Sequence, residues 1–295
     1  MLEHKHCAVC NSEQLSLLMK LEDYSISKEK FELFQCSNCQ FIFTQNVPVE
    51  NEIGKYYQSE DYISHSDTNE GLINKAYHFV RKIMLGRKYK LIKSLYKGND
   101  ILDIGCGTGY FLDFMKRKQY KTLGVEADSD ARAQGIKNFG LDILPPEDLF
   151  NGAIKDKFGI ISLWHVLEHL YDPKEYMKAI RGILKDDGHL IIAVPNCSCY
   201  DAEYYKNYWA GYDVPRHLWH FTPSTLELFA KNTGFEVIKM KGLPFDPFYV
   251  ALLSEKYKGG SLGMIKGGMI GFISFIKSLF NVRKSSSVIY VLKKK

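Results

Sequence analysis

The chain has 295 residues, of which 45% are hydrophobic, enough for one sizeable α/β core and a small additional module. The formal net charge of +5 arises from 39 basic and 34 acidic residues spread along the sequence, so no dense basic tract indicates a nucleic-acid binder. The first residues lack the apolar stretch of a secretory signal, and the chain contains no run of about eighteen uncharged apolar residues. We therefore expect a cytoplasmic protein with two unequal domains.

Four of the seven cysteines form two CxxC pairs, Cys7 with Cys10 and Cys36 with Cys39. In a reducing compartment this spacing indicates metal ligation rather than disulfide bonds. Four thiolates complete the tetrahedral shell that a structural zinc ion prefers. The sequence thus predicts a small zinc ribbon over residues 1–45, with no chemistry at the metal.

Residues 46–97 have a helical pattern, with apolar side chains at helical spacing from Leu72 to Leu95. Gly98 and Asn99 end this pattern. We expect a helical linker that also acts as a lid over a cofactor.

From residue 98 to residue 295, short apolar runs alternate with amphipathic segments, which predicts βαβ units and a parallel sheet. The strands are expected at 100–104, 122–126, 158–164 and 189–194, and the helices at 110–118 and 173–184. Two further strands are expected at 235–242 and 286–294. The segment between them, about residues 244–285, is too long for a simple hairpin loop and predicts an insertion.

A glycine-rich turn follows the first of these strands, with Gly105, Gly107 and Gly109 directly after Asp103. Glycines remove the Cβ atoms that would keep the backbone away from a ligand, and Asp103 can accept hydrogen bonds at the end of the strand. Glu126 ends the second strand, where a carboxylate can bind both hydroxyls of a ribose. Strand, glycines, helix and acid together indicate a nucleotide-like cofactor.

The stretch DIGCGTG resembles the first motif of class I S-adenosylmethionine methyltransferases. The resemblance implies a Rossmann-like α/β sheet that binds S-adenosylmethionine. It also implies that Asp103 and the backbone at Gly105 hold the methionine part, while Glu126 holds the ribose. Asp148 and Leu149, which follow the third strand, are the candidates to flank the adenine.

The fourth strand runs into Trp164 and His165, at the carboxyl edge of the sheet where open α/β proteins bind ligands. Both are placed near the transferable methyl group. The stretch that continues to Glu168 and His169 looks like a segment of ubiquinone-pathway O-methyltransferases, in which we expect this pair to anchor a helix start. It is also similar to the metal-binding segment of small-RNA 2′-O-methyltransferases, but a histidine replaces the first glutamate, so no catalytic metal is expected.

Aromatic and titratable side chains are dense after the fifth strand, where His217 and His220 would share one face of a helical turn. This segment resembles one in sugar C-methyltransferases that carry an amino-terminal zinc ribbon. The resemblance implies that His217 is the general base, supported by His220, His165 and Tyr212. Structural hydrogen bonding is the alternative for either histidine of the segment.

Arg216, next to the expected base, could hold a phosphate or carboxylate of the substrate. The same C-methyltransferases have a tyrosine-rich stretch before the first strand, and residues 56–65 look like it. Tyr62 and His65 are therefore expected to close over the cofactor, with a surface helix as the alternative.

Residues 262–280 are apolar except for Lys266, Lys277 and small residues, and on a helix the two lysines form one narrow stripe. Such a helix could cover the pocket, make an oligomer contact or lie in a membrane interface. We rank a pocket cover and an oligomer contact slightly above a membrane interface.

These observations predict a methyltransferase acting on a hydroxyl or carbon of a small molecule, with a sugar or another surface-polysaccharide precursor as the leading substrate class. One alternative is an RNA methyltransferase that uses the ribbon for RNA recognition, although the modest charge argues against it. Another is a module that binds the cofactor without catalysis.

Overall fold

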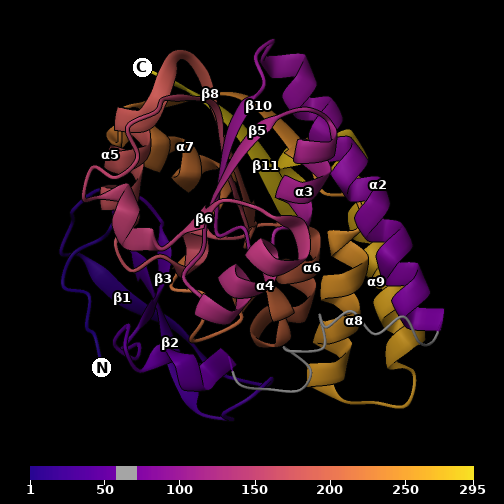
Figure 1. The fold of residues 1–295 in the computed structure, drawn as a ribbon. Coiled ribbons are helices and arrows are strands. Elements are labelled where there is room, and N and C mark those ends of the chain that lie inside the picture. Colours follow the sequence, from indigo (N-terminus) through magenta and orange to yellow (C-terminus); the bar gives the residue numbers. More distant parts are fainter. Residues whose placement is uncertain (58–71) are drawn as a thin grey trace.

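The computed structural model describes residues 1–57 and 72–295 (Figure 1), with side chains of the second range from Phe79 onward. Tyr62 and His65, expected to close over the cofactor, lie outside the described residues.

A seven-stranded sheet forms the centre of the molecule, in the order β10-β11-β8-β7-β4-β5-β6. The five strands from β4 to β8 run parallel, and β11 is antiparallel to both of its neighbours, β8 and β10. The strands are β4 (Asp100–Ile104), β5 (Lys121–Val125), β6 (Ile143–Leu144), β7 (Phe158–Trp164), β8 (Leu184–Pro195), β10 (Phe235–Gly242) and β11 (Ser287–Lys294). This arrangement confirms the predicted Rossmann-like α/β sheet.

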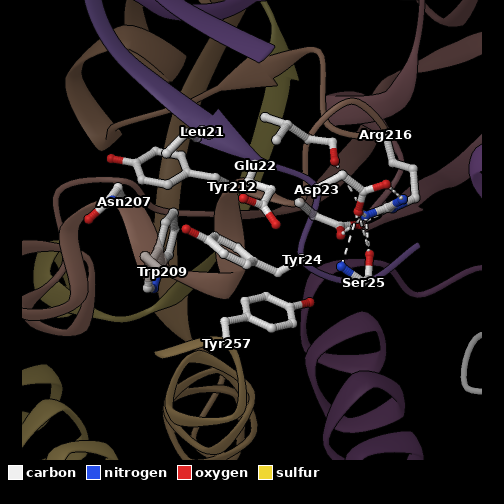
Figure 2. A pocket seen from close by; sticks show the side chains of 12 residues that line it. Leu21, Glu22, Asp23, Tyr24, Ser25, Asn207, Trp209, Tyr212, Arg216 and Tyr257 are labelled. Carbon is white, nitrogen blue, oxygen red and sulfur yellow. Dashed lines mark hydrogen bonds and ion pairs between the residues drawn. The ribbon is translucent and has the colours of Figure 1, made fainter. Parts of the chain in front are cut away.

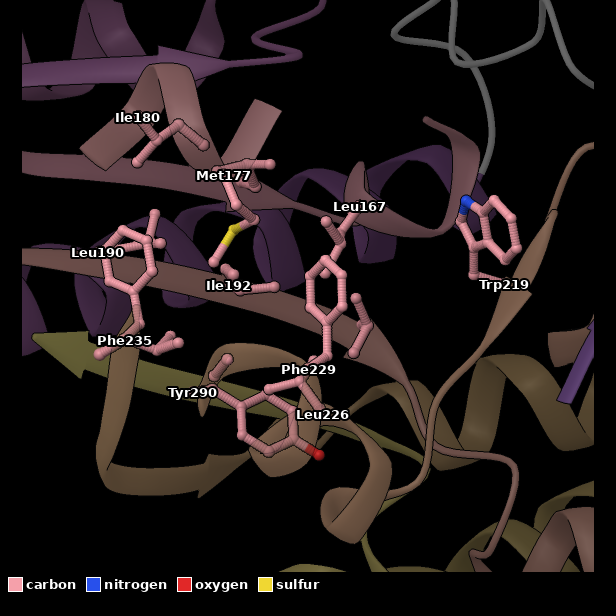
Figure 3. Close-up of a cluster of buried hydrophobic side chains, with 14 of the residues drawn as sticks. Leu167, Met177, Ile180, Leu190, Ile192, Trp219, Leu226, Phe229, Phe235 and Tyr290 are labelled. Carbon is pink, nitrogen blue, oxygen red and sulfur yellow. The ribbon is translucent and has the colours of Figure 1, made fainter. Parts of the chain in front are cut away.

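Helices cover both faces of the sheet because side chains alternate between the faces along each strand. Ile101 of β4 packs with α2 (Leu72–Leu95) and α3 (Tyr110–Arg117), whereas its neighbour Leu102 packs with α5 (Pro173–Ile183) and α7 (Pro223–Asn232). Figure 3 shows the second of these clusters, in which Met177 and Phe229 lie against strand residues such as Leu190.

Polar side chains mark the starts of three helices at the sheet edge. Asp128 accepts from the backbone N–H of Ala131 at 2.7 Å before α4 (Ser129–Phe139), and Asp172 and Thr222 cap α5 and α7 in the same way. Each cap satisfies a backbone donor that the helix itself leaves unpaired. The caps thereby fix where the loops at the carboxyl edge turn into helices.

The amino-terminal module is a four-stranded sheet in the order β1-β2-β3-β9. Its own strands are β1 (Leu15–Glu22), β2 (Lys30–Cys36) and β3 (Ile42–Gln45), and β9 (Trp219–His220) comes from the segment after β8. Trp219 and Phe41 belong to the same core cluster as the α5 face of the central sheet. The cysteine-bearing module therefore shares a sheet and a core with the rest of the chain. The predicted boundary at residue 45 stays a prediction.

The insertion between β10 and β11 is a helical hairpin of α8 (Asp246–Lys258) and α9 (Gly263–Phe280). The helices pack closely through glycines, since a Cβ atom added at Gly267 would lie 2.9 Å from the Cα of Leu252, and one at Gly271 would lie 2.8 Å from the Cα of Phe248. By length and composition alone α9 could cross a membrane, which is weak evidence by itself.

Candidate functional site

The four ribbon cysteines converge on one point. Their Sγ atoms all lie within 4.8 Å of one another, with 3.5 Å between Cys7 and Cys39 and 3.5 Å between Cys10 and Cys36. The backbone N–H of Val9 donates to the Cys7 sulfur, as such groups do around thiolates. The donor set and its closed shape fit a tetrahedral structural zinc ion.

The glycine-rich turn after β4 runs in a conformation that side chains disfavour. Gly105, Gly107 and Gly109 have φ values of 70°, 54° and 85°. A Cβ atom at Gly105 would lie 2.3 Å from a methyl group of Val166, and one at Gly109 would lie 2.4 Å from Leu141. At these two positions glycine is needed for the backbone angle and for packing within the protein. At Gly107 no atom of the described residues, apart from its chain neighbours, lies within 4 Å of the added Cβ, so this position is open to a ligand.

Two carboxylates flank the turn. Asp103 is buried at the end of β4 and accepts from the Ser162 hydroxyl at 2.5 Å. Burial raises the pKa of Asp103 to about 7, although the Ser162 hydroxyl and the charge of Lys88 favour the ionised form. Glu126 accepts from the backbone N–H of Gly107 at 2.7 Å, so its carboxylate is fixed beside the turn.

Lys88 of α2 reaches the same region, which no motif in the sequence indicated. Its ammonium lies 4.0 Å from the centre of the Trp164 ring. Burial lowers the pKa of Lys88 to about 8, although the negative charges of Asp103 and Asp246 act to raise it. Trp164 Nε1 is buried without a hydrogen-bond partner among the described residues. An orphaned donor beside a buried carboxylate and ammonium fits a site shaped for a polar cofactor.

The candidate adenine-flanking pair lies in a short 3₁₀ helix, Pro146–Leu149. Leu149 is buried in the core, and Asp148 accepts from the side chain of Asn151 at 2.8 Å. Their contact with adenine stays a prediction.

His165 follows β7 with a positive φ of 58° and lies between two carboxylates. Nδ1 is 3.4 Å from Glu168, and Nε2 is 3.5 Å from Asp246 at the start of α8. Burial alone would lower the pKa of His165, but the two carboxylates raise it to about 10. The two carboxylates thus favour the protonated form of His165, in which neither ring nitrogen keeps a free lone pair. The part played by Asp246 could not be foreseen, since it belongs to the insertion.

His217 and His169 form a pair at the carboxyl edge of the sheet, with ring centres 4.6 Å apart. His217 Nδ1 lies 2.9 Å from the Gly211 carbonyl, and His169 Nδ1 lies 3.0 Å from the Arg216 carbonyl. A carbonyl oxygen can only accept, so in these contacts Nδ1 carries the hydrogen. In the neutral rings Nε2 is then the atom with the free lone pair.

Glu168 lies beside this pair and is buried, with neither carboxylate oxygen in a hydrogen bond to a described residue. Burial opposes ionisation, but the proximity of His165 lowers the pKa of Glu168. The pKa of His169 is lowered to about 4 by burial and by His217. Ligand atoms of Glu168, His169 and His217 all lie within 4.8 Å of one another and could also hold a metal ion.

His220 does not share a face with His217, because Trp219 and His220 form strand β9 rather than a helical turn. His220 is buried, its Nε2 lies 2.9 Å from the Thr44 hydroxyl, and burial lowers its pKa well below the ordinary value. Tyr212 is also buried, packed edge-on against Trp209 and His220. Both expected supporting residues therefore lie in the packing between the ribbon and the loop.

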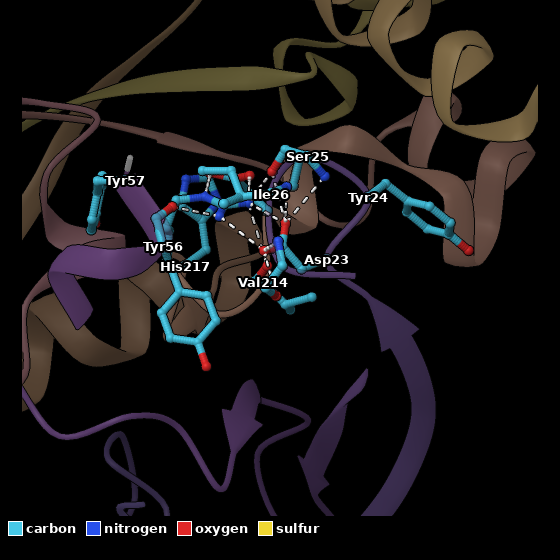
Figure 4. A network of polar contacts seen from close by, with 12 residues as sticks. Asp23, Tyr24, Ser25, Ile26, Tyr56, Tyr57, Val214 and His217 are labelled. Atoms are coloured by element: carbon cyan, nitrogen blue, oxygen red, sulfur yellow. Dashed lines mark hydrogen bonds and ion pairs between the residues drawn. The ribbon is translucent and has the colours of Figure 1, made fainter. Parts of the chain in front are cut away.

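Arg216 is not available to a substrate, which corrects the expectation from the sequence. Its guanidinium is fully buried and pairs with Asp23 at 2.9 Å and Asp213 at 2.7 Å (Figure 2). It also donates to the Tyr56 carbonyl at 2.8 Å. Figure 4 shows the polar network that includes Tyr56 and Asp23. Arg216 thus ties the loop to the ribbon strands, and this places the neighbouring His217.

The comparisons with known proteins agree with this geometry. Residues 77–240 match the family model described as a methyltransferase domain. A ubiquinone biosynthesis O-methyltransferase of Acinetobacter baumannii (strain AYE) is 24% identical over 169 residues, which are 51% of this chain and 69% of that protein. A protein of the same name from Dinoroseobacter shibae is 29% identical over 171 residues, 52% of this chain and 66% of that protein.

Solved structures show the same fold. Magnesium protoporphyrin IX methyltransferase from Synechocystis PCC 6803, with bound SAH, matches with a TM-score of 0.53 at 10% identity, over 81% of this chain and 97% of that chain. Coclaurine N-methyltransferase, bound to N-methylheliamine and SAH, matches with a TM-score of 0.50 at 13% identity, over 84% of this chain and 81% of that chain.

The sheet order and the glycine turn define a class I methyltransferase fold. The chain belongs to the methyltransferase domain family. It is an S-adenosylmethionine-dependent methyltransferase with a cysteine-bearing amino-terminal module.

Proposed function

We propose that the protein transfers a methyl group from S-adenosylmethionine to a hydroxyl or carbon of a small molecule, with a sugar or another surface-polysaccharide precursor as the acceptor. The ubiquinone-pathway relatives are O-methyltransferases by name, which supports a hydroxyl acceptor. The zinc-ribbon sugar methyltransferases that the histidine-bearing segment resembles support the sugar class.

The observation that carries this proposal is the orientation of His217. The cofactor supplies an activated methyl group, so the protein must orient the acceptor and remove its proton. His217 Nδ1 is held by the Gly211 carbonyl, which leaves Nε2 as the proton acceptor in a neutral ring. His165 lies between Glu168 and Asp246, which favour its protonated form, so we assign it an electrostatic role and not that of the base.

Asp103, the turn at Gly105 and Gly107, and Glu126 are the residues that we propose hold the cofactor. Lys88 and Trp164 close the same region from α2 and β7. In this arrangement the carboxylates bind the cationic and hydroxyl groups of the cofactor, and the backbone approaches it at Gly107.

The test is a screen of nucleotide sugars and phenolic acceptors with the purified protein, with methylated product measured by mass spectrometry. On an accepted substrate, His217→Ala should lower turnover by about a hundredfold or more while cofactor affinity stays unchanged. The matched control is His6→Ala, an exposed histidine of the ribbon. Wild-type turnover in His217→Ala would contradict the assignment.

The metal-ligand geometry at Glu168, His169 and His217 provides a second arm of this test. If His217 acts as the general base, a chelator that removes loosely bound metal but leaves the ribbon zinc in place should not change turnover. Loss of turnover on chelation, with recovery on adding Mn²⁺ or Zn²⁺, would instead make His217 a metal ligand.

A further inference from the structure

Helix α9 has an apolar surface, which we call the α9 face. It consists of the exposed residues Ile265, Met269 and Phe272 and the half-buried Ile276, with the exposed residues Met264, Leu279 and Phe280 toward its ends. Met269, Phe272 and Ile265 are 60%, 55% and 63% exposed, and Phe280 is 88% exposed. Soluble monomers rarely expose contiguous apolar patches of this kind. The α9 face therefore requires an occupant.

The helix is not loosely placed, because its opposite side is firmly packed. Its buried positions are Gly267, Ile270, Gly271 and Ser274, which follow the spacing of a single helical stripe. The Ser274 hydroxyl donates to buried Asp201 at 2.6 Å. At about 100° per residue, the α9 face points directly away from this stripe. The apolar surface is thus presented outward by a rigid element.

Charge distinguishes among the possible occupants. From Lys256 to Phe280 the chain carries four lysines and no acidic residue. Lys266 and Lys277 are exposed and lie together on one edge of the α9 face, about 90° from its centre. An apolar face bordered by lysines matches an anionic bilayer surface, where side chains enter the acyl region and ammonium groups meet phosphates.

We propose that the α8–α9 hairpin docks the protein onto membranes that contain anionic lipids, with α9 lying in the plane of the interface. The helix does not span the bilayer, since the protein packs along its buried stripe. Its 18 residues rise only about 27 Å, slightly less than a hydrocarbon core of about 30 Å. This inference goes beyond the proposed function and does not depend on the acceptor.

The hairpin is also in contact with residues around the proposed reaction site. The hairpin begins at Asp246, which contacts His165 at 3.5 Å, and the Ser254 hydroxyl of α8 accepts from the backbone N–H of Ala210 in the loop that carries His217. Helix α8 of the hairpin therefore contacts both His165 and the loop that carries His217.

The experiment is cosedimentation of the full chain with vesicles of phosphatidylcholine alone and of phosphatidylcholine with phosphatidylglycerol. Binding should be stronger to the anionic vesicles and should weaken with salt. Met269→Glu/Phe272→Glu should lower the affinity tenfold or more, because two apolar side chains that would enter the bilayer on docking are replaced by acids. Lys266→Glu/Lys277→Glu should remove the preference for anionic vesicles.

The matched control is Ile136→Glu/Ile238→Glu, which adds two acids at exposed apolar positions outside the hairpin and should bind like the wild type. All variants should keep the wild-type melting temperature, since the altered side chains are exposed. Equal sedimentation of the wild type and the α9 variant would overturn the proposal. So would a wild-type dimer in light scattering that Met269→Glu/Phe272→Glu dissociates while neither protein binds vesicles.

Discussion

Glu126 and Gly107 are joined by a hydrogen bond of 2.7 Å, from the backbone N–H of the glycine turn to the carboxylate at the end of β5. The other carboxylate oxygen accepts from the backbone N–H of Asp128 at 3.0 Å. Both oxygens are thereby fixed before any ligand binds, and each keeps a further lone pair. A carboxylate fixed in this way binds a ribose diol without the cost of ordering its side chain.

Replacing Glu126 should consequently weaken cofactor binding. We expect Glu126→Ala to lower the affinity for S-adenosylmethionine about tenfold or more in calorimetry, since hydrogen bonds to a charged group are lost. Glu147→Ala, which removes an exposed acid of the neighbouring 3₁₀ helix, is the control. An unchanged affinity in folded Glu126→Ala protein would show that the ribose lies elsewhere.

The ribbon should contain one zinc ion per chain, held by Cys7, Cys10, Cys36 and Cys39. Elemental analysis should find no stoichiometric zinc in the Cys36→Ser/Cys39→Ser protein, whereas Cys106→Ser should retain it. Because β9 completes the ribbon sheet, loss of the metal should also lower the melting temperature of the whole protein. Full zinc retention in the double variant would exclude these ligands.

Arg216 should matter for stability. Arg216→Met leaves Asp23 buried without its partner, and breaking such a pair costs about 3–5 kcal/mol in the free energy of unfolding. Lys20→Ala, which breaks the more exposed pair with Glu32, should cost less than about 1 kcal/mol. Chemical denaturation measures both, and similar losses in the two variants would contradict the structural role of Arg216.

Structural features that depend on neighbouring residues in the chain could be predicted from the sequence. Periodicity and backbone requirements predict β4, β5 and the glycine turn between them. Asp103 is the penultimate residue of β4, and Glu126 directly follows β5. The partners of His165 and Arg216 were not predictable, since Asp246 and Asp23 come from segments far along the chain. The prediction that His220 shares a helical face with His217 was wrong, because His220 lies in strand β9, which pairs with the distant strand β3. A strand of two residues is too short to give a periodic pattern in the sequence.

Asp246 should control the titration of His165, whose pKa of about 10 lies above the ordinary histidine value of about 6.5. A group whose folded-state pKa is raised stabilises the fold fully below its unfolded pKa. This contribution should therefore be present below about pH 6.5 and be lost as the pH rises toward 10.

Asp246→Asn removes one of the two carboxylates, so NMR titration of the His165 ring should show a lower pKa. The decline in stability should still begin near pH 6.5, but it should end at a lower pH and be smaller than in the wild type. Asp130→Asn, on an exposed turn of α4, should leave the His165 titration unchanged. If His165 of the wild type already titrates near pH 6.5, the two carboxylates do not hold its proton, and His165 would again compete with His217 as the base.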